Sequence, residues 1–180
     1  MFRTRSALIG AARVVYRSLV NIDLILETLN RHDVEYILLG GMNFLLRHKP
    51  VLTFDVDVWI NDTAENRACC ETALGQLDAS WGATDEEWRP VVQWKPGWLA
   101  RQSMFCMTSP HGAIDVFRSV KGLGSWSSSA ERAAQGRTAS GVPCLGLCDE
   151  DMLACQYALD ETERKLDRVK VLEEALGNHE

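Results

Sequence analysis

The sequence lacks any uninterrupted run of about 18 apolar residues, the length that a membrane-spanning helix needs, so we expect no membrane span. The first 20 residues also lack the apolar block of a secretory signal peptide, because arginines at positions 3, 5, 13 and 17 interrupt it. We therefore expect a cytoplasmic protein. Internal repeats and domain-length linkers are absent too, and 180 residues fit one compact unit with a real hydrophobic core.

The sequence has no excess of positive charge: 25 Asp and Glu against 19 Lys and Arg give a formal net charge of −6. Affinity for nucleic acid comes largely from Lys and Arg that neutralise phosphates, so we expect no extended nucleic-acid surface. The one local basic stretch, residues 1–17, carries four arginines and no acid. It reads as an amphipathic helix packed on the protein, with a nucleic-acid-binding arm as the less favoured alternative.

The cysteines lack the pattern of a metal site. Cys144 and Cys148 are spaced as C-x3-C, but no second pair of cysteines or histidines lies nearby to complete four zinc ligands. The other four cysteines stand among apolar residues, and we expect them to be reduced and packed in the core: Cys69, Cys70, Cys106 and Cys155.

Hydrophobic periodicity predicts a mixed α and β chain. Helical spacing or composition predicts helices over 21–31, 42–47 and 64–77, with Asn21 and Thr63 as N-caps. β-branched and aromatic runs predict strands over 35–39, 53–60, 103–108 and 113–118, the last two joined as a hairpin. The stretch 80–100, with four tryptophans and two prolines, is too broken for one regular element.

The rest of the chain divides into a loop and a tail. Residues 119–141 are rich in Gly, Ser and Ala, which indicates a loop or lid. From Asp149, a candidate N-cap, to Leu176 the pattern is helical and predicts two helices or one kinked helix. We therefore predict an α+β fold with an N-terminal helical extension (1–20), a core (21–148) and a C-terminal helical tail (149–180).

Two acidic residues share one face of the clearest strand. Residues two apart in a strand point to the same side, so Asp55 and Asp57 project together, with Cα atoms about 7 Å apart. Asp115 lies inside the second hairpin strand, where an unpaired acid would be costly to bury. If that strand pairs beside 53–60, all three carboxylates face one point and can hold Mg²⁺.

A glycine pair adds a phosphate site. Gly40 and Gly41 stand between a predicted strand and a predicted helix, where backbone N–H groups and a helix N-terminus attract anions. Thirteen residues separate this pair from Asp55, the first acid of the Asp-x-Asp strand. Asp-x-Asp alone also occurs in haloacid-dehalogenase phosphatases and in glycosyltransferases. The phosphatase pattern typically has Gly-Thr just after the second Asp, where this chain has Val58-Trp59. Glycosyltransferase domains are normally longer than this chain.

Together these motifs resemble the minimal nucleotidyltransferases of the DNA polymerase β type, which include abortive-infection and toxin-antitoxin members. The resemblance is carried by YILLGGMNFLLRHKPVLTFDVDVWI (36–60) and HGAIDVF (111–117), followed by a helical tail. It implies the nucleotidyltransferase fold, a small mixed sheet flanked by helices. It also implies an enzyme that transfers a nucleoside monophosphate from a nucleoside triphosphate, ATP by default, to a hydroxyl on a protein, an RNA or a small molecule.

The resemblance also implies residue roles. Asp55, Asp57 and Asp115 would bind Mg²⁺, with Asp115 helping to deprotonate the attacking hydroxyl, and Gly40 and Gly41 would contact the triphosphate. Three further residues are candidate nucleotide contacts: Asn43, Thr53 and Lys49. Asn43 could instead satisfy local backbone groups. Thr53 could instead support the carboxylates, or be an ordinary strand residue without a role at the site.

Two departures from the family pattern suggest an alternative function. Many relatives carry Arg four residues before the first Asp and Lys in the first tail helix, where this chain has Val51 and Cys155-Gln156. Lys49, Arg47 or Lys165 are the candidate substitutes. Without one, the chain would be a catalytically silent binding domain, for example a component of a toxin-antitoxin pair.

Overall fold

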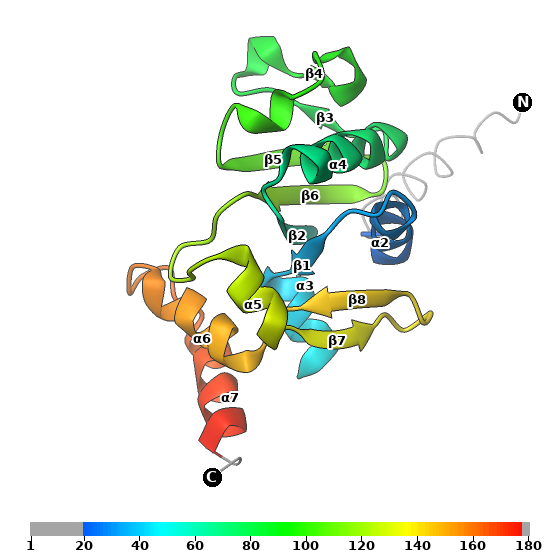
Figure 1. Ribbon diagram of the computed structural model, residues 1–180. Helices are drawn as coiled ribbons and strands as arrows, with labels where there is room; N and C mark the ends of the chain where they lie inside the picture. Colours follow the sequence, from blue (N-terminus) through cyan, green and yellow to red (C-terminus); the bar gives the residue numbers. More distant parts are fainter. Residues whose placement is uncertain (1–19, 178–180) are drawn as a thin grey trace, which may run out of the picture.

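The computed structural model describes residues 20–177, so the helix expected in 1–17 lies outside the described residues. Eight strands form one mixed sheet in the order β4-β3-β5-β6-β2-β1-β8-β7 (Figure 1). The strands are β1 (Tyr36–Leu38), β2 (Asp55–Ile60), β3 (Ser80–Trp81), β4 (Arg89–Pro90), β5 (Met104–Ser109), β6 (Gly112–Phe117), β7 (Ala134–Arg137) and β8 (Pro143–Gly146).

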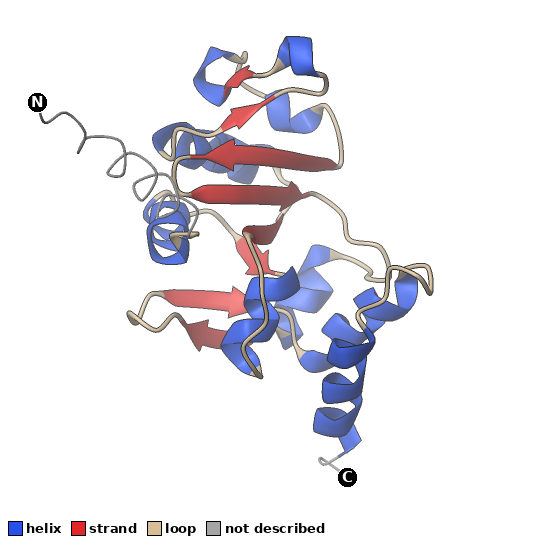
Figure 2. Ribbon diagram, turned by 180° about the vertical axis from the view of Figure 1, so that it is seen from behind, coloured by secondary structure: helices blue, strands red, loops and turns tan. Residues whose placement is uncertain are grey.

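Six α-helices belong to the described chain, and Figure 2 shows how they flank the sheet. They are α2 (Ile22–Arg31), α3 (Gly40–Arg47), α4 (Ala64–Gln76), α5 (Trp126–Arg132), α6 (Asp149–Ala158) and α7 (Leu166–Gly177). The predicted α+β class, with a small mixed sheet and a helical C-terminal segment, is confirmed.

The centre of the sheet is built as the sequence predicts. β5 and β6 form the expected hairpin, and β6 runs parallel to β2 with Asp57 opposite Asp115. β1 lies on the other side of β2, antiparallel to it. The regular part of β2 begins at Asp55, two residues later than predicted, so Thr53 lies in the approach to the strand.

The sheet separates two hydrophobic clusters. Alternate residues of β2 and β6, such as Val56 and Ile114, pack with α2 and α4 in the larger cluster. The opposite face contributes Ile37 and Trp59 to a smaller cluster with α3, α6 and α7. Because side chains alternate along a strand, the acidic residues of β2 and β6 lie on the face of the smaller cluster.

Local signals start the helices of the core. The side chain of Asn21 accepts a hydrogen bond from the N–H of Leu24, as an N-cap does, and Thr63 does the same for Asn66. Asn66 is itself buried, and its side chain bonds Glu35 and the carbonyl of Asn61. It therefore ties the start of α4 to the strands β1 and β2.

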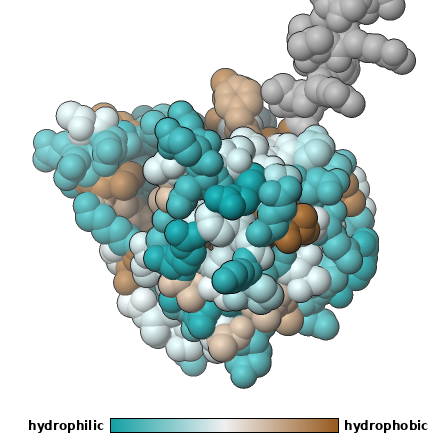
Figure 3. All heavy atoms as spheres, turned by 90° about the horizontal axis from the view of Figure 1, so that it is seen from above, coloured by the Kyte–Doolittle hydropathy of each residue, from teal (hydrophilic) through white to brown (hydrophobic). Residues whose placement is uncertain are grey.

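The tryptophan-rich stretch is irregular, as expected, and packs against the edge of the sheet. It consists of two-residue strands and three 3₁₀ turns, Asp85–Glu87, Val91–Gln93 and Trp98–Ala100. Trp81 stacks on Trp98 with ring centroids 5.5 Å apart and meets Phe105 edge-on at 4.9 Å. Aromatic packing thus holds a segment that has little regular backbone pairing. From this end the surface is mostly hydrophilic with small, separate apolar patches (Figure 3).

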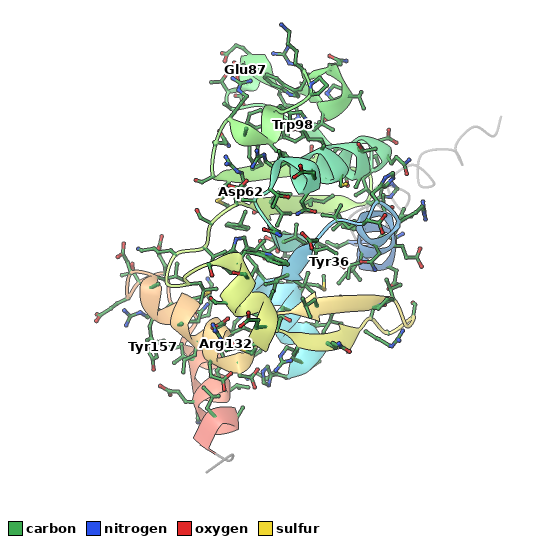
Figure 4. The ribbon with its side chains drawn as sticks, viewed as in Figure 1. Tyr36, Asp62, Glu87, Trp98, Arg132 and Tyr157 are labelled. Atoms are coloured by element: carbon green, nitrogen blue, oxygen red, sulfur yellow. The ribbon has the colours of Figure 1, made fainter. Side chains whose placement is uncertain are left out.

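The prediction of a loop or lid over 119–141 is wrong in part. Ser125 accepts a hydrogen bond from the N–H of Ser128 and starts α5, and β7 follows and pairs with β8. Strand β8 was not predicted, since its sequence PCLG has little β character. α5 is held by the ion pair between Arg132 and Asp151 of α6, whose N and O atoms are 2.7 Å apart; Figure 4 labels Arg132.

Two smaller predictions are also corrected. Cys148, not Asp149, occupies the N-cap position of α6, and the Asp149 carboxylate instead binds Arg47 at 2.8 Å and His48 at 3.0 Å. Cys106 is exposed rather than packed in the core, because it lies opposite Asp115 of β6, on the face of the sheet that carries the acids. Within residues 20–177, no helix has the length and apolar character that crossing a bilayer requires.

Replacing Asn66 by alanine tests the link between α4 and the strands. Asn66→Ala removes three side-chain hydrogen bonds and leaves the N–H of Glu35 without its partner, and we expect it to lower the free energy of unfolding by about 2 to 4 kcal/mol. Thr63→Ala, which removes only the cap, should cost about 1 kcal/mol. Urea denaturation measures both, and equal losses in the two variants would contradict the assignment.

Candidate active site

The three predicted carboxylates meet at one point. β2 carries Asp55 and Asp57, and the parallel neighbour β6 carries Asp115 directly opposite Asp57. One oxygen from each of the three carboxylates can be chosen so that all lie within 4.8 Å of one another. Among the described residues this is the one such group of potential metal ligands. The arrangement that the sequence predicted for these side chains is present.

Crowding changes the acidity of these groups. Burial, with the neighbouring charges of Asp55 and Asp115, raises the pKa of Asp57 to about 7. Burial and the charge of Asp55 likewise raise the pKa of Asp115. Carboxylates that resist ionisation together are stabilised by a cation, and oxygen ligands are those that Mg²⁺ prefers. The chemistry of this donor set therefore fits a divalent metal ion.

The glycine pair lies directly against the carboxylates. Gly40 has a φ of +60°, and a Cβ there would come 1.8 Å from Oδ2 of Asp57. Only glycine fits this position, on both conformation and space. α3 begins at Gly40, two residues earlier than predicted, and no side chain caps it. The N–H groups of its first turn therefore have no partner within the helix and are available to an anion.

Thr53 connects the turn to the acids. Its hydroxyl donates a hydrogen bond to Oδ1 of Asp55, with the two oxygens 2.8 Å apart. A Cβ at Gly41 would lie 2.5 Å from the same hydroxyl oxygen, so the side chain also packs against the turn. The structure thus places Thr53 at the site in contact with a carboxylate, which is one of its two predicted roles.

The other two predicted nucleotide contacts lie elsewhere. Asn43 is 2 % exposed, and its amide donates to the carbonyl of Leu147 at 3.1 Å. It joins α3 to the segment that follows β8 and faces away from the carboxylates. Lys49 is exposed and does not line the space beside the acids. Proximity to the carboxylates therefore supports neither residue as a nucleotide contact.

A cavity of about 470 Å³ opens beside Gly40 and Asp57. Its walls come from β5, β6 and the chain after it, and from α3, α6 and α7. Most of the lining is apolar, including Phe44, Met152 and Leu172. The lining contains one acid, Asp57, and two cations, Lys121 and Arg168. The cavity suits a largely apolar group next to an anionic one.

Arg168 is the site residue that the sequence analysis missed. It belongs to α7, and its Nη2 would be 3.3 Å from a Cβ at Gly41. The charge of Arg168 also lowers the pKa of Asp57, although burial and the charges of the other two acids raise that pKa more. A signal existed, because Arg168 and Leu172 are four residues apart and therefore share a face of α7. The sequence could not reveal that this face meets the glycine turn.

The proposed substitutes for the missing basic residues are not at the site. Arg47 is committed to Asp149, and Lys165 is exposed outside the cavity lining. Val51 packs with the smaller hydrophobic cluster. Gln156 does line the cavity, where its Oε1 accepts a hydrogen bond from the N–H of Lys165 at 2.9 Å.

Comparison with solved structures identifies the fold. A crystal structure of ANT(2'')-Ia in complex with adenylyl-2''-tobramycin matches with a TM-score of 0.56 at 13% identity, covering 94% of this chain and 91% of that chain. A solution structure of the antibiotic-resistance factor ANT(2'')-Ia gives 0.54 at 13% identity, covering 95% and 88%. No protein-family model and no curated protein sequence matches the chain. The fold is of the nucleotidyltransferase type, and identity this low extends the likeness to the fold alone.

The pH dependence of stability tests the carboxylate cluster. With its pKa raised from 3.8 to about 7, Asp57 holds a proton in the folded chain that it loses in the unfolded chain. Between these values the folded state binds more protons, so the free energy of unfolding falls as pH rises. In EDTA, we expect wild type to lose stability relative to Asp57→Asn from pH 4 to pH 7.

A surface carboxylate provides the control for that comparison. The Arg118 guanidinium, with smaller help from Arg67, lowers the pKa of Asp62, so its protonation changes only below the ordinary range of an acid. The stability difference between wild type and Asp62→Asn should stay constant above pH 5. A constant difference for Asp57→Asn as well would show that the acids are not crowded.

The hydroxyl of Thr53 is tested by substitution. Thr53→Val keeps the shape but removes the donor to Asp55, and we expect divalent-metal affinity to fall about tenfold. Thr53→Ser keeps the hydroxyl and should stay within a factor of about two or three of wild type. The affinity of each variant is measured by titration with Mn²⁺, with the melting temperature as the readout. If Thr53→Val binds Mn²⁺ as tightly as wild type does, the hydroxyl has no role in holding the metal ligand.

Proposed function

We propose that this chain is a metal-dependent nucleotidyltransferase that transfers a nucleoside monophosphate from a nucleoside triphosphate to a hydroxyl group. The observation that carries the proposal is the meeting of Asp55, Asp57 and Asp115 beside an uncapped helix N-terminus that begins at Gly40. Metal ligands and an anion site in contact are what phosphoryl transfer requires. The nucleotidyltransferase-type fold supports the same chemistry.

Each residue has a defined task in this proposal. Asp55 and Asp57 would hold Mg²⁺, and Asp115 would contribute a third carboxylate oxygen. Bound Mg²⁺ would neutralise charge on the triphosphate and on the departing pyrophosphate. The N–H groups at Gly40 and Gly41 orient the phosphates by hydrogen bonds. Thr53 holds the Asp55 carboxylate in place through the bond described above.

The proposed step balances without any further reagent. A bond forms between the acceptor hydroxyl oxygen and the α-phosphorus, while the bond from that phosphorus to the β-phosphate oxygen breaks. Pyrophosphate leaves, and Asp115 takes the proton of the hydroxyl. Alignment of the two oxygens on opposite sides of the phosphorus is the main contribution of the site.

ATP is the donor that we propose, in line with the adenylyl product named for ANT(2'')-Ia. An acceptor like tobramycin is less well supported. An amino sugar carries several positive charges, which require acidic partners, whereas the cavity lining offers Asp57 alone, beside Lys121 and Arg168. The acceptor classes that fit better are neutral or anionic: a protein hydroxyl, an RNA end or an uncharged small molecule.

A catalytically silent domain, for example in a toxin-antitoxin pair, is the rival proposal. Its support is that Val51 and Gln156 stand where the family pattern has basic residues. Arg168 beside the glycine turn weakens this support, because it brings a positive charge to the same place. The complete set of three carboxylates also counts against it, because a silent site has no need to keep crowded acids whose ionisation is unfavourable.

Nucleotide binding and label transfer test the function. We expect one NTP to raise the melting temperature in Mg²⁺ but not in EDTA, and Asp57→Asn to abolish the shift. With α-³²P-labelled NTP, wild type should transfer label to the acceptor-containing fraction of a cell extract, separated into protein, RNA and small molecules. Asp115→Asn should bind NTP but transfer at least about a hundredfold more slowly. Absence of both binding and transfer in wild type would favour the silent domain.

A further inference from the structure

The proposed triphosphate requires more positive charge than Mg²⁺ and backbone N–H groups supply. The family pattern that the sequence resembles has a Lys in the first tail helix, near the place where this chain has Cys155-Gln156. We infer that Arg168 of α7 provides this charge and that the second tail helix is part of the nucleotide site. The inference rests on the proposed function, and it assigns the triphosphate contact to a helix that the family pattern does not indicate.

The position of the guanidinium carries the inference. Its Nη2 lies over the second glycine of the turn, 3.3 Å from where a Cβ of Gly41 would be. An anion held by the first-turn N–H groups of α3 would therefore lie within reach of the guanidinium. A planar guanidinium can give two parallel hydrogen bonds to one phosphate.

Arg168 has no competing partner in the described chain. No salt bridge or side-chain hydrogen bond within residues 20–177 involves it, in contrast to Arg47, Arg118 and Arg132, which all bind carboxylates. The guanidinium instead lies over the ring of Phe44, whose centroid is 5.7 Å from the guanidinium carbon. A cation–π contact of this kind uses none of the N–H donors, so they stay free for an anion.

A purely structural role explains Arg168 less well. α7 is already anchored by Val169 and Leu172, which are 7 % and 1 % exposed. Figure 1 shows α6 and α7 side by side, and their contact does not require the guanidinium. The half-buried guanidinium makes no direct ion pair among residues 20–177, and a bound anion would offset the cost of removing its charge from water.

Gln156 of the first tail helix has a different role in this chain. Its Oε1 accepts a hydrogen bond from the N–H of Lys165, just before α7 begins. The side chain thus fixes the start of α7 instead of supplying charge from α6. Gln156 and Arg168 line the same cavity, so a lysine at position 156 would point its ammonium into the space that the guanidinium serves.

Nucleotide affinity measured by calorimetry in Mg²⁺ tests the inference. Arg168→Gln keeps most of the stem length and removes the charge; we expect NTP affinity to fall about tenfold or more, and NMP affinity to change less than about twofold. Arg168→Lys should lie between wild type and Arg168→Gln. Lys165→Ala, which removes an exposed neighbouring charge outside the cavity, should match wild type and serves as the control.

A rescue variant gives a sharper readout. The double variant Gln156→Lys/Arg168→Gln should bind NTP at least about threefold more tightly than Arg168→Gln alone, because a positive charge returns to the same cavity. Circular dichroism and melting temperature without ligand check that each variant folds. If Arg168→Gln unfolds, Arg168→Lys with NTP and NMP makes the same comparison.

The outcomes separate the two proposals. Equal NTP affinity in wild type and Arg168→Gln overturns the role of Arg168 and leaves the function standing. An equal loss for NTP and NMP also overturns it, because the guanidinium would then not act on the β- and γ-phosphates. If wild type itself shows no Mg²⁺-dependent NTP binding, the proposed function and the inference fail together.

Discussion

Three carboxylates held close together between two parallel strands are the constraint on which the site depends. The register that sets Asp57 opposite Asp115 cannot change by one residue without turning the acids into the apolar face. The same register buries Val56 and Ile114 on the other side, so the hydrophobic core enforces the geometry of the acids. Stability of the fold and repulsion within the site are therefore two results of one strand pairing.

The surroundings of the three carboxylates determine how strongly they repel one another. The turn at Gly40 comes so close to Asp57 that no side chain fits between them. The hydroxyl of Thr53 engages one oxygen of Asp55, and the N-terminus of α3 and the Arg168 guanidinium bring positive potential. These features come from three separate segments of the chain: the Gly40 turn at the start of α3, the approach to β2 and helix α7.

The centre of this site is predictable from sequence because its signals are local. Alternation in 53–60 fixes which residues share a face, and the glycines mark the turn. The β5–β6 hairpin follows from the turn chemistry around Pro110 and Gly112. Pairing of β6 with β2 was a conditional expectation, supported by the cost of burying an unpaired Asp115.

Features fixed by tertiary contact were not predictable. β8 has weak strand character and forms because β1 and β7 offer it partners. Asn43 looked like a ligand residue from its place after the turn, yet its amide satisfies the Leu147 carbonyl 104 residues away. Arg168 looked like one charge among many on a surface helix, because only packing of α7 shows which side faces the turn.

The C-terminal segment contacts helix α3 at both of its ends. Arg168 reaches its first turn, and Asp149 binds Arg47 and His48 at its last. Asp151, two residues further along α6, binds Arg132 and so connects α5 to the same segment. A crosslink that shifts α7 would therefore displace Arg168 from the first turn of α3, so the geometry beside Gly41 can be changed from outside the core of the protein.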